Sequence, residues 1–146
     1  MLKGNLPTAH FAALMSLANF IFFHFPFFSF VFQNLDYASF NGIVTILSLV
    51  VVMLVLNFFV FYLLLFISNR IGKFLLLAFF VINAAAVYFI NTYSVIIDES
   101  MVGNILNTNY AESSSFFSVK FVLYVIVLGV VPAIYIIKAN IINETL

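Results

Sequence analysis

Residues 43–67 read IVTILSLVVVMLVLNFFVFYLLLFI and contain no charged side chain. A helix needs about 20 consecutive apolar residues to cross the roughly 30 Å of hydrocarbon in a bilayer, so this stretch is long enough to span a membrane. Polar and apolar residues do not alternate along it, as they would in a strand of a membrane barrel. The stretch therefore predicts a transmembrane α-helix.

Three further apolar stretches, at about residues 11–32, 74–93 and 119–138, show the same pattern. Hydrophobic residues make up 66% of the chain and charged residues 7%, whereas soluble domains carry roughly 25% charged residues. The first stretch is too long for a signal-peptide core and lacks a small-residue cleavage site after it, which indicates an uncleaved anchor. The predicted fold class is all-α: a polytopic transmembrane helix bundle with four spans, forming a single domain over residues 1–146.

The charge balance and the absence of cysteine exclude several classes of protein. Five Lys and Arg residues stand against five Asp and Glu residues, so the chain has no basic footprint for nucleic acid and no acidic tail. Without cysteine, disulfide frameworks, thiolate metal sites and thiol nucleophiles are excluded. The partners that the composition predicts are membrane lipids.

The few cations predict how the chain is oriented. In the predicted topology, residues 94–118 lie on the side opposite the N-terminus, together with Asp36 and with Lys120 at a helix start. Positive charge is enriched in cytoplasmic loops, so the N-terminal side should be cytoplasmic and residues 94–118 periplasmic in a bacterium. The cations on the N-terminal side are Lys3, Arg70, Lys73 and Lys138.

Four polar residues interrupt the apolar stretches: Asn19, His24, Asn57 and Asn83. Such side chains are costly in lipid, so each should face a neighbouring helix or a wet cavity. Two interpretations remain open for each of them: a structural hydrogen bond between helices, or contact with a lipid headgroup or other ligand. A single histidine without a second ligand at suitable spacing is a poor metal site. In the fourth stretch, Pro132 predicts a kink.

The polar segment at about residues 94–118 carries an apolar stripe at near-helical spacing, which includes Met101, Ile105 and Tyr110. Asn104, Thr108 and Glu112 stand four residues apart, so on a helix they share one face. This pattern predicts an amphipathic interfacial periplasmic helix between spans three and four; a solvated loop is the alternative. The three side chains suit an ethanolamine headgroup, because a carboxylate pairs with the ammonium while an amide and a hydroxyl hold phosphate oxygens.

Residues 83–113 carry a resemblance to a known family. They read NAAAVYFINTYSVIIDESMVGNILNTNYAES. The run contains, in this order, small Ala residues, an aromatic pair, TY, IID, SM, an Asn, a Thr and AES. The run resembles the end of the third membrane helix and the following periplasmic segment of the lipid A phosphoethanolamine transferases, the family that includes the mobile colistin-resistance enzymes.

The resemblance implies a site and an activity. It implies that Asn104, Thr108 and Glu112 help to bind the phosphoethanolamine-bearing substrate. Family members work at the bacterial inner membrane, take phosphoethanolamine from phosphatidylethanolamine and pass it through a phospho-threonine intermediate to lipid A or a related lipopolysaccharide glycan. This modification underlies polymyxin resistance. The transfer uses zinc, which lowers the pKa of the threonine hydroxyl and neutralises phosphoryl charge.

The sequence departs from the family pattern in one respect. The family's threonine nucleophile and zinc ligands lie in a periplasmic catalytic domain, and nothing like that domain is found in these residues. Thr108 matches one of the family's substrate-binding positions and not its nucleophile. We therefore expect this chain to hold no catalytic residue and to bind no metal, and to act as the membrane anchor of a longer enzyme. The alternative is a stand-alone, non-catalytic membrane protein that binds lipid or scaffolds a partner.

Overall fold

The computed structural model describes residues 6–93 and 118–142, which form helices and one short strand pair. In chain order the elements are β1 (Leu6–Pro7), α1 (Thr8–Phe23), α2 (Phe25–Asn34), α3 (Phe40–Ile67), α4 (Asn69–Tyr93), α7 (Val119–Tyr124), the π-helix η1 (Val125–Val130), α8 (Val131–Lys138) and β2 (Ile141–Ile142). The predicted all-α bundle is therefore confirmed. The predicted interfacial helix falls in residues 94–117, outside the described residues.

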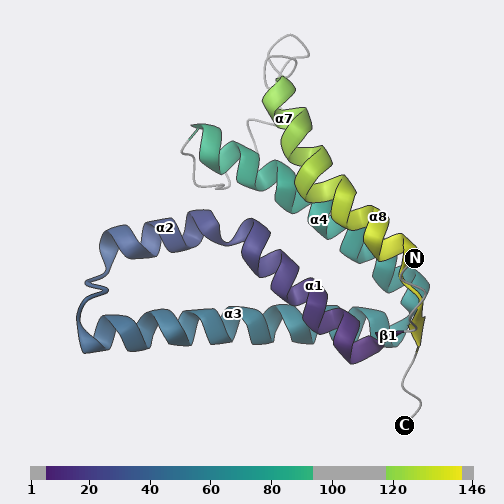
Figure 1. Cartoon of the computed structure of the whole chain (residues 1–146), viewed down its shortest axis with the longest axis horizontal. Helices are drawn as coiled ribbons and strands as arrows, with labels where there is room; N and C mark the ends of the chain where they lie inside the picture. Colours follow the sequence, from purple (N-terminus) through teal and green to yellow (C-terminus); the bar gives the residue numbers. More distant parts are fainter. Residues whose placement is uncertain (1–5, 94–117, 143–146) are drawn as a thin grey trace.

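Successive long helices run in opposite directions (Figure 1). Helix α1 packs along α3, α4 follows α3 after a tight turn, and α4 packs along η1 and α8. Strands β1 and β2 pair in parallel beside the start of α1 and the end of α8, with Leu6 opposite Ile141. We call this end of the bundle the strand end; the end at which α3 and α7 begin is the opposite end.

Three helical segments have the length and composition to cross a membrane: α3, residues Asn69–Thr92 of α4, and the continuous run Val119–Lys138. The pair α1 and α2 makes a fourth candidate if both helices belong to one broken span. Their outer surfaces remain apolar, with Val55 57% and Phe59 60% exposed on α3. In lipid this exposure carries no hydrophobic penalty, because acyl chains are as apolar as these side chains.

The first predicted span differs from the observed one, because it is broken. Helix α1 ends at Phe23, α2 begins at Phe25, and the two are bent by 58°. Pro26 lies in the first turn of α2. In a continuous helix it would offer no N–H to the carbonyl of Phe22, and its ring would clash with that carbonyl. The chain therefore turns at His24, which becomes the corner between the two helices.

Pro132 is accommodated by a change in helix type. The six residues before α8 form the π-helix η1, and Pro132 then lies in the first turn of α8, where a missing N–H is best tolerated. A π-helical turn inside an α-helix widens the hydrogen-bonding pattern locally. The run from Val119 to Lys138 thus remains one candidate span.

The interior of the bundle is a cluster of apolar side chains at which α1, α3, α4 and α8 meet. Within it, Phe23 and Phe61 each make an aromatic contact with Phe80 of α4, at centroid distances of 5.4 and 6.4 Å. Its larger members are Phe11, Met15, Phe23, Phe61, Leu65, Leu76, Phe80 and Ile136.

Gly72 allows the start of α4 to lie against the end of α3. A Cβ built on Gly72 would lie 2.6 Å from the carbonyl oxygen of Leu64 and 2.9 Å from the Cα of Leu65. These backbone atoms cannot move independently of their helix, so the added Cβ would fit only if α3 and α4 moved apart. We expect Gly72→Ala to lower the free energy of unfolding by about 1–3 kcal/mol, measured by reversible denaturation of the purified chain in mixed micelles.

The matched control for this substitution is Gly129→Ala, at the contact of η1 with α4. There an added Cβ would lie 3.1 Å from the Cα of Val81 and 3.5 Å from the Cβ of Ala84. These contacts are milder, so the loss of stability should be smaller. A loss at Gly129 equal to that at Gly72 would contradict the steric explanation.

Candidate functional site: a polar cavity at the helix break

A cavity of about 290 Å³ lies between α1, α3 and α4, next to the break at His24. All four polar residues that interrupt the apolar stretches line it, although they come from three different helices. We call it the polar cavity. Its lining residues are Asn19, Phe23, His24, Asn57, Phe79, Asn83, Ala86, Val87 and Ile90.

Two asparagines join across the polar cavity. The Asn83 side-chain amide of α4 donates to Oδ1 of Asn19 on α1 over 3.2 Å. Asn19 is only 1% exposed, so an unpaired amide there would carry a desolvation cost. This bond agrees with the structural interpretation of these two residues, since an interhelical hydrogen bond satisfies a polar group away from water.

His24 is oriented by the helix break. Its Nδ1 lies 3.3 Å from the backbone carbonyl oxygen of Asn19, and its ring stacks on Phe20 with a centroid distance of 5.1 Å. A carbonyl oxygen only accepts, so Nδ1 carries the proton in this contact. The imidazole therefore joins the amides as a polar group of the cavity lining.

The sequence identified these four residues singly and gave no signal that they would meet. Asn57 and Asn83 lie on different helices, and only the packing of α3 and α4 against α1 brings them to Asn19 and His24. Ser16 likewise has no signal in the sequence, yet it is 2% exposed and its hydroxyl donates to the carbonyl oxygen of Leu54 over 2.8 Å, which bonds α1 to α3.

The chemistry available in the polar cavity is binding by neutral groups. Amides and an imidazole donate and accept hydrogen bonds, and none of the lining residues is a carboxylate, a lysine or an arginine. The volume holds a small polar group or several waters, at roughly 30 Å³ of liquid for each water. Within the described part of the chain, no nucleophile and base pair lines this cavity.

The described residues also do not fit the zinc ion that the family resemblance implies. Over residues 6–93 and 118–142, no three or more His, Cys, Asp or Glu side chains gather closely enough to hold a metal ion. His10 and His24 are fourteen positions apart on or at the end of α1, which is roughly 20 Å along a helix. No step through a metal is assigned to these residues.

The predicted donor row of Asn104, Thr108 and Glu112 lies outside the described residues. The chain on either side of it is held together at the opposite end of the bundle. The hydroxyl groups of Tyr88 on α4 and Ser118 are 2.8 Å apart, and the Ser118 hydroxyl caps α7 by accepting from the Phe121 N–H over 3.1 Å. Both flanks of residues 94–117 are thus fixed to the same part of the fold.

Comparison with known proteins gives a consistent result. Residues 53–146 match the family described as "Phosphoethanolamine transferase EptA/EptB". The chain is similar to "Phosphoethanolamine transferase EptA" of Helicobacter pylori, with 36% identity over 132 residues, covering 90% of this chain and 24% of the relative. It is also similar to the protein of the same name from Escherichia coli strain K12, with 34% identity over 141 residues, covering 92% of this chain and 25% of the relative.

The chain therefore spans about a quarter of the length of these curated relatives. No solved structure matches the chain.

The bond between Asn19 and Asn83 generates a testable prediction. In a double-mutant cycle with Asn19→Ala and Asn83→Ala, the coupling free energy should be about 0.6 kcal/mol and no more than about 1.7 kcal/mol, the average and the maximum measured for hydrogen bonds between membrane helices. Reversible unfolding of the chain and its three variants in mixed micelles measures it.

The control cycle pairs Asn19→Ala with Asn57→Ala. Asn57 lines the same cavity, but no hydrogen bond to Asn19 is found among the described residues. The coupling in this cycle should be smaller. Equal coupling in the two cycles would mean that the cavity, and not the bond to Asn83, accounts for the effect.

Proposed function

Because the chain belongs to the phosphoethanolamine transferase EptA/EptB family, we propose that it is the N-terminal membrane part of a phosphoethanolamine transferase. The observation that carries this proposal is the family match over residues 53–146, which covers α4, α8 and the segment with the donor row. In this role the helices anchor the enzyme in the bacterial inner membrane. They also bring the lipid donor to the site of transfer.

The proposed reaction moves phosphoethanolamine from phosphatidylethanolamine to lipid A or a related lipopolysaccharide or periplasmic glycan. A threonine hydroxyl attacks the donor phosphorus, a new O–P bond forms, the bond to diacylglycerol breaks, and diacylglycerol leaves with the proton. An oxygen of the acceptor then displaces the threonine. The nucleophile and the zinc site belong, in this proposal, to the part of the enzyme outside these residues.

In the proposed reaction, this chain binds the lipid donor, phosphatidylethanolamine, through Asn104, Thr108 and Glu112. The Glu112 carboxylate pairs with the ethanolamine ammonium, and this pair is the strongest contact because both groups are charged. The amide of Asn104 and the hydroxyl of Thr108 donate to the phosphate oxygens. The bond between Tyr88 and Ser118 supports this assignment, because it holds both flanks of the segment at one end of the bundle.

The proposed orientation puts the strand end in the cytoplasm and residues 94–118 in the periplasm. Arg70 and Lys73 begin α4 and Lys138 ends α8, so three cations lie at the strand end. Asp36 and Lys120 lie at the opposite end, before α3 and in α7. The excess of positive charge at the strand end is what the positive-inside rule requires of a cytoplasmic face.

Glu112→Ala in the full-length enzyme tests this function. Removal of a charge-assisted contact worth about 1.5–3 kcal/mol should lower kcat/KM for phosphatidylethanolamine about 10- to 150-fold. The assay is mass spectrometry of phosphoethanolamine-modified lipid A after incubation of the purified enzyme with both lipids.

Glu99→Ala is the matched control, since it removes a carboxylate from the same segment outside the donor row. It should leave turnover within about twofold of the parent enzyme. Unchanged lipid A modification by Glu112→Ala would refute the role of Glu112. If the parent enzyme transferred phosphoethanolamine to no glycan acceptor, the result would instead favour a non-catalytic lipid-binding protein.

A further inference from the structure

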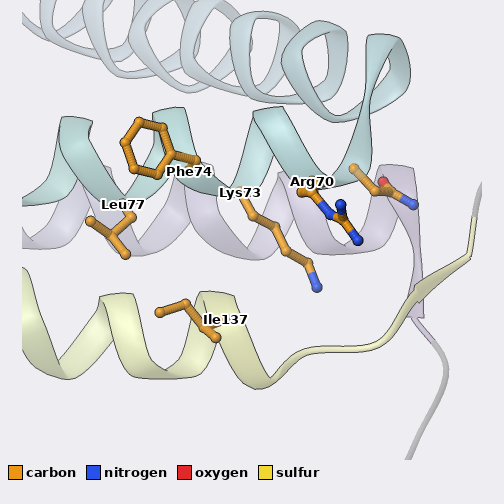
Figure 2. A pocket seen from close by; sticks show the side chains of 6 residues that line it. Arg70, Lys73, Phe74, Leu77 and Ile137 are labelled. Atoms are coloured by element: carbon orange, nitrogen blue, oxygen red, sulfur yellow. The ribbon is translucent and has the colours of Figure 1, made fainter.

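A second cavity, of about 410 Å³, lies at the strand end between α4 and α8 (Figure 2). One part of its wall is charged and polar and the other is apolar. Figure 2 shows the Lys73 side chain extending from α4 towards the α8 side, near Arg70. We call this cavity the basic groove. Its lining residues are Asn69, Arg70, Lys73, Phe74, Leu77 and Ile137.

The cations of the basic groove retain free hydrogen-bonding capacity. Lys73 Nζ donates to the carbonyl oxygen of Ala139 over 2.5 Å, which uses one of its three donors. The exposed Arg70 has five N–H donors, and within the described residues none of them makes a hydrogen bond. The groove thus presents several unused donors on two positive groups.

The groove has no internal counter-charge in the part of the chain that the structure describes. Across residues 6–93 and 118–142 the only carboxylate side chain is Asp36. Asp36 precedes α3, whereas Arg70 and Lys73 follow α3, so the whole length of that helix separates them. An anionic ligand would balance the charge of these two cations.

The remaining wall of the groove is apolar and continues into the outer surface of the bundle. Phe74 is 68% exposed and Ile137 is 61% exposed. Leu77 follows Phe74 by three positions and so lies nearly one turn further along the same face of α4. An inorganic anion would leave this wall uncovered. An anion that carries an acyl chain would cover it.

We propose that the basic groove binds one acidic glycerophospholipid from the leaflet at the strand end. Its phosphate lies between Arg70 and Lys73, and one acyl chain lies along Phe74, Leu77 and Ile137. A phospholipid with an ethanolamine headgroup fits less well, because its ammonium adds positive charge beside two cations. This site is distinct from the proposed donor site, and the proposal does not depend on transferase activity.

The test measures lipid retention by the full-length protein. The protein is extracted from nanodiscs that contain equal amounts of phosphatidylglycerol and phosphatidylethanolamine with the same acyl chains, and bound lipids are counted by native mass spectrometry. The parent protein should retain one phosphatidylglycerol in the groove, in addition to any phosphatidylethanolamine held at the proposed donor site. The double substitution Arg70→Gln with Lys73→Gln should weaken this binding about thirtyfold, equivalent to about 1 kcal/mol for each cation.

The charge-matched control is Lys120→Gln with Lys138→Gln, which also removes two positive charges but none from the groove lining. It should retain phosphatidylglycerol like the parent. Equal losses in the two double variants would mean general charge attraction and would overturn the site. A loss of phosphatidylethanolamine from the Arg70→Gln with Lys73→Gln variant as large as its loss of phosphatidylglycerol would overturn the selectivity.

Two further experiments identify the bound ligand, and the first of them leaves both cations of the groove unchanged. Ile137→Trp fills the apolar wall and leaves both cations in place, so it should weaken binding of long-chain phosphatidylglycerol but not of its dihexanoyl form. An equal effect on both forms would refute the acyl contact. Displacement of the long-chain lipid by inorganic phosphate alone would identify a free phosphate site instead of a lipid site.

Discussion

The absence of water from the hydrocarbon core is the constraint on which the rest of this structure depends. Every backbone N–H and C=O at that depth must be bonded within the protein, which leaves helices as the usable form for an open chain. The long apolar helices of this chain follow directly from that requirement. Departures from regular helix are therefore confined to places where neighbouring groups or a cavity compensate. Within residues 6–93 and 118–142, both departures occur next to a proline.

Pro26 and Pro132, the prolines that lie within the described helices, have different effects because their surroundings differ. At Pro132 the π-helix η1 absorbs the misfit, and the run continues as one candidate span packed against α4. At Pro26 the helix turns by 58°. There the polar cavity lies beside the corner, and the carbonyl of Asn19 is approached by the His24 ring. Polar side chains thus accumulate where the backbone is least regular.

The sequence predicted the helices better than their contacts. Length and apolarity were sufficient for α3 and α4, because spanning a bilayer depends on the chain's own residues. The broken first span was missed, although Pro26 was visible, since proline bends some membrane helices and is accommodated in others, as Pro132 is. Nothing in the sequence indicated that Asn19 would pair with Asn83. It depends on the rotation of α1 and α4 about their axes, which packing sets, and no spacing within one helix records it.

The two cavities differ in the charge that they can accept, and this difference follows from their position along the bundle. The polar cavity is lined by neutral amides and an imidazole, because a fixed charge deep in lipid is expensive. The basic groove lies at a helix end, where the long side chains of Arg70 and Lys73 can reach the interface. Of the two cavities, only the groove supplies the charge that an acidic phospholipid needs. An ethanolamine ammonium pairs best with a carboxylate, and the lining of neither cavity includes one.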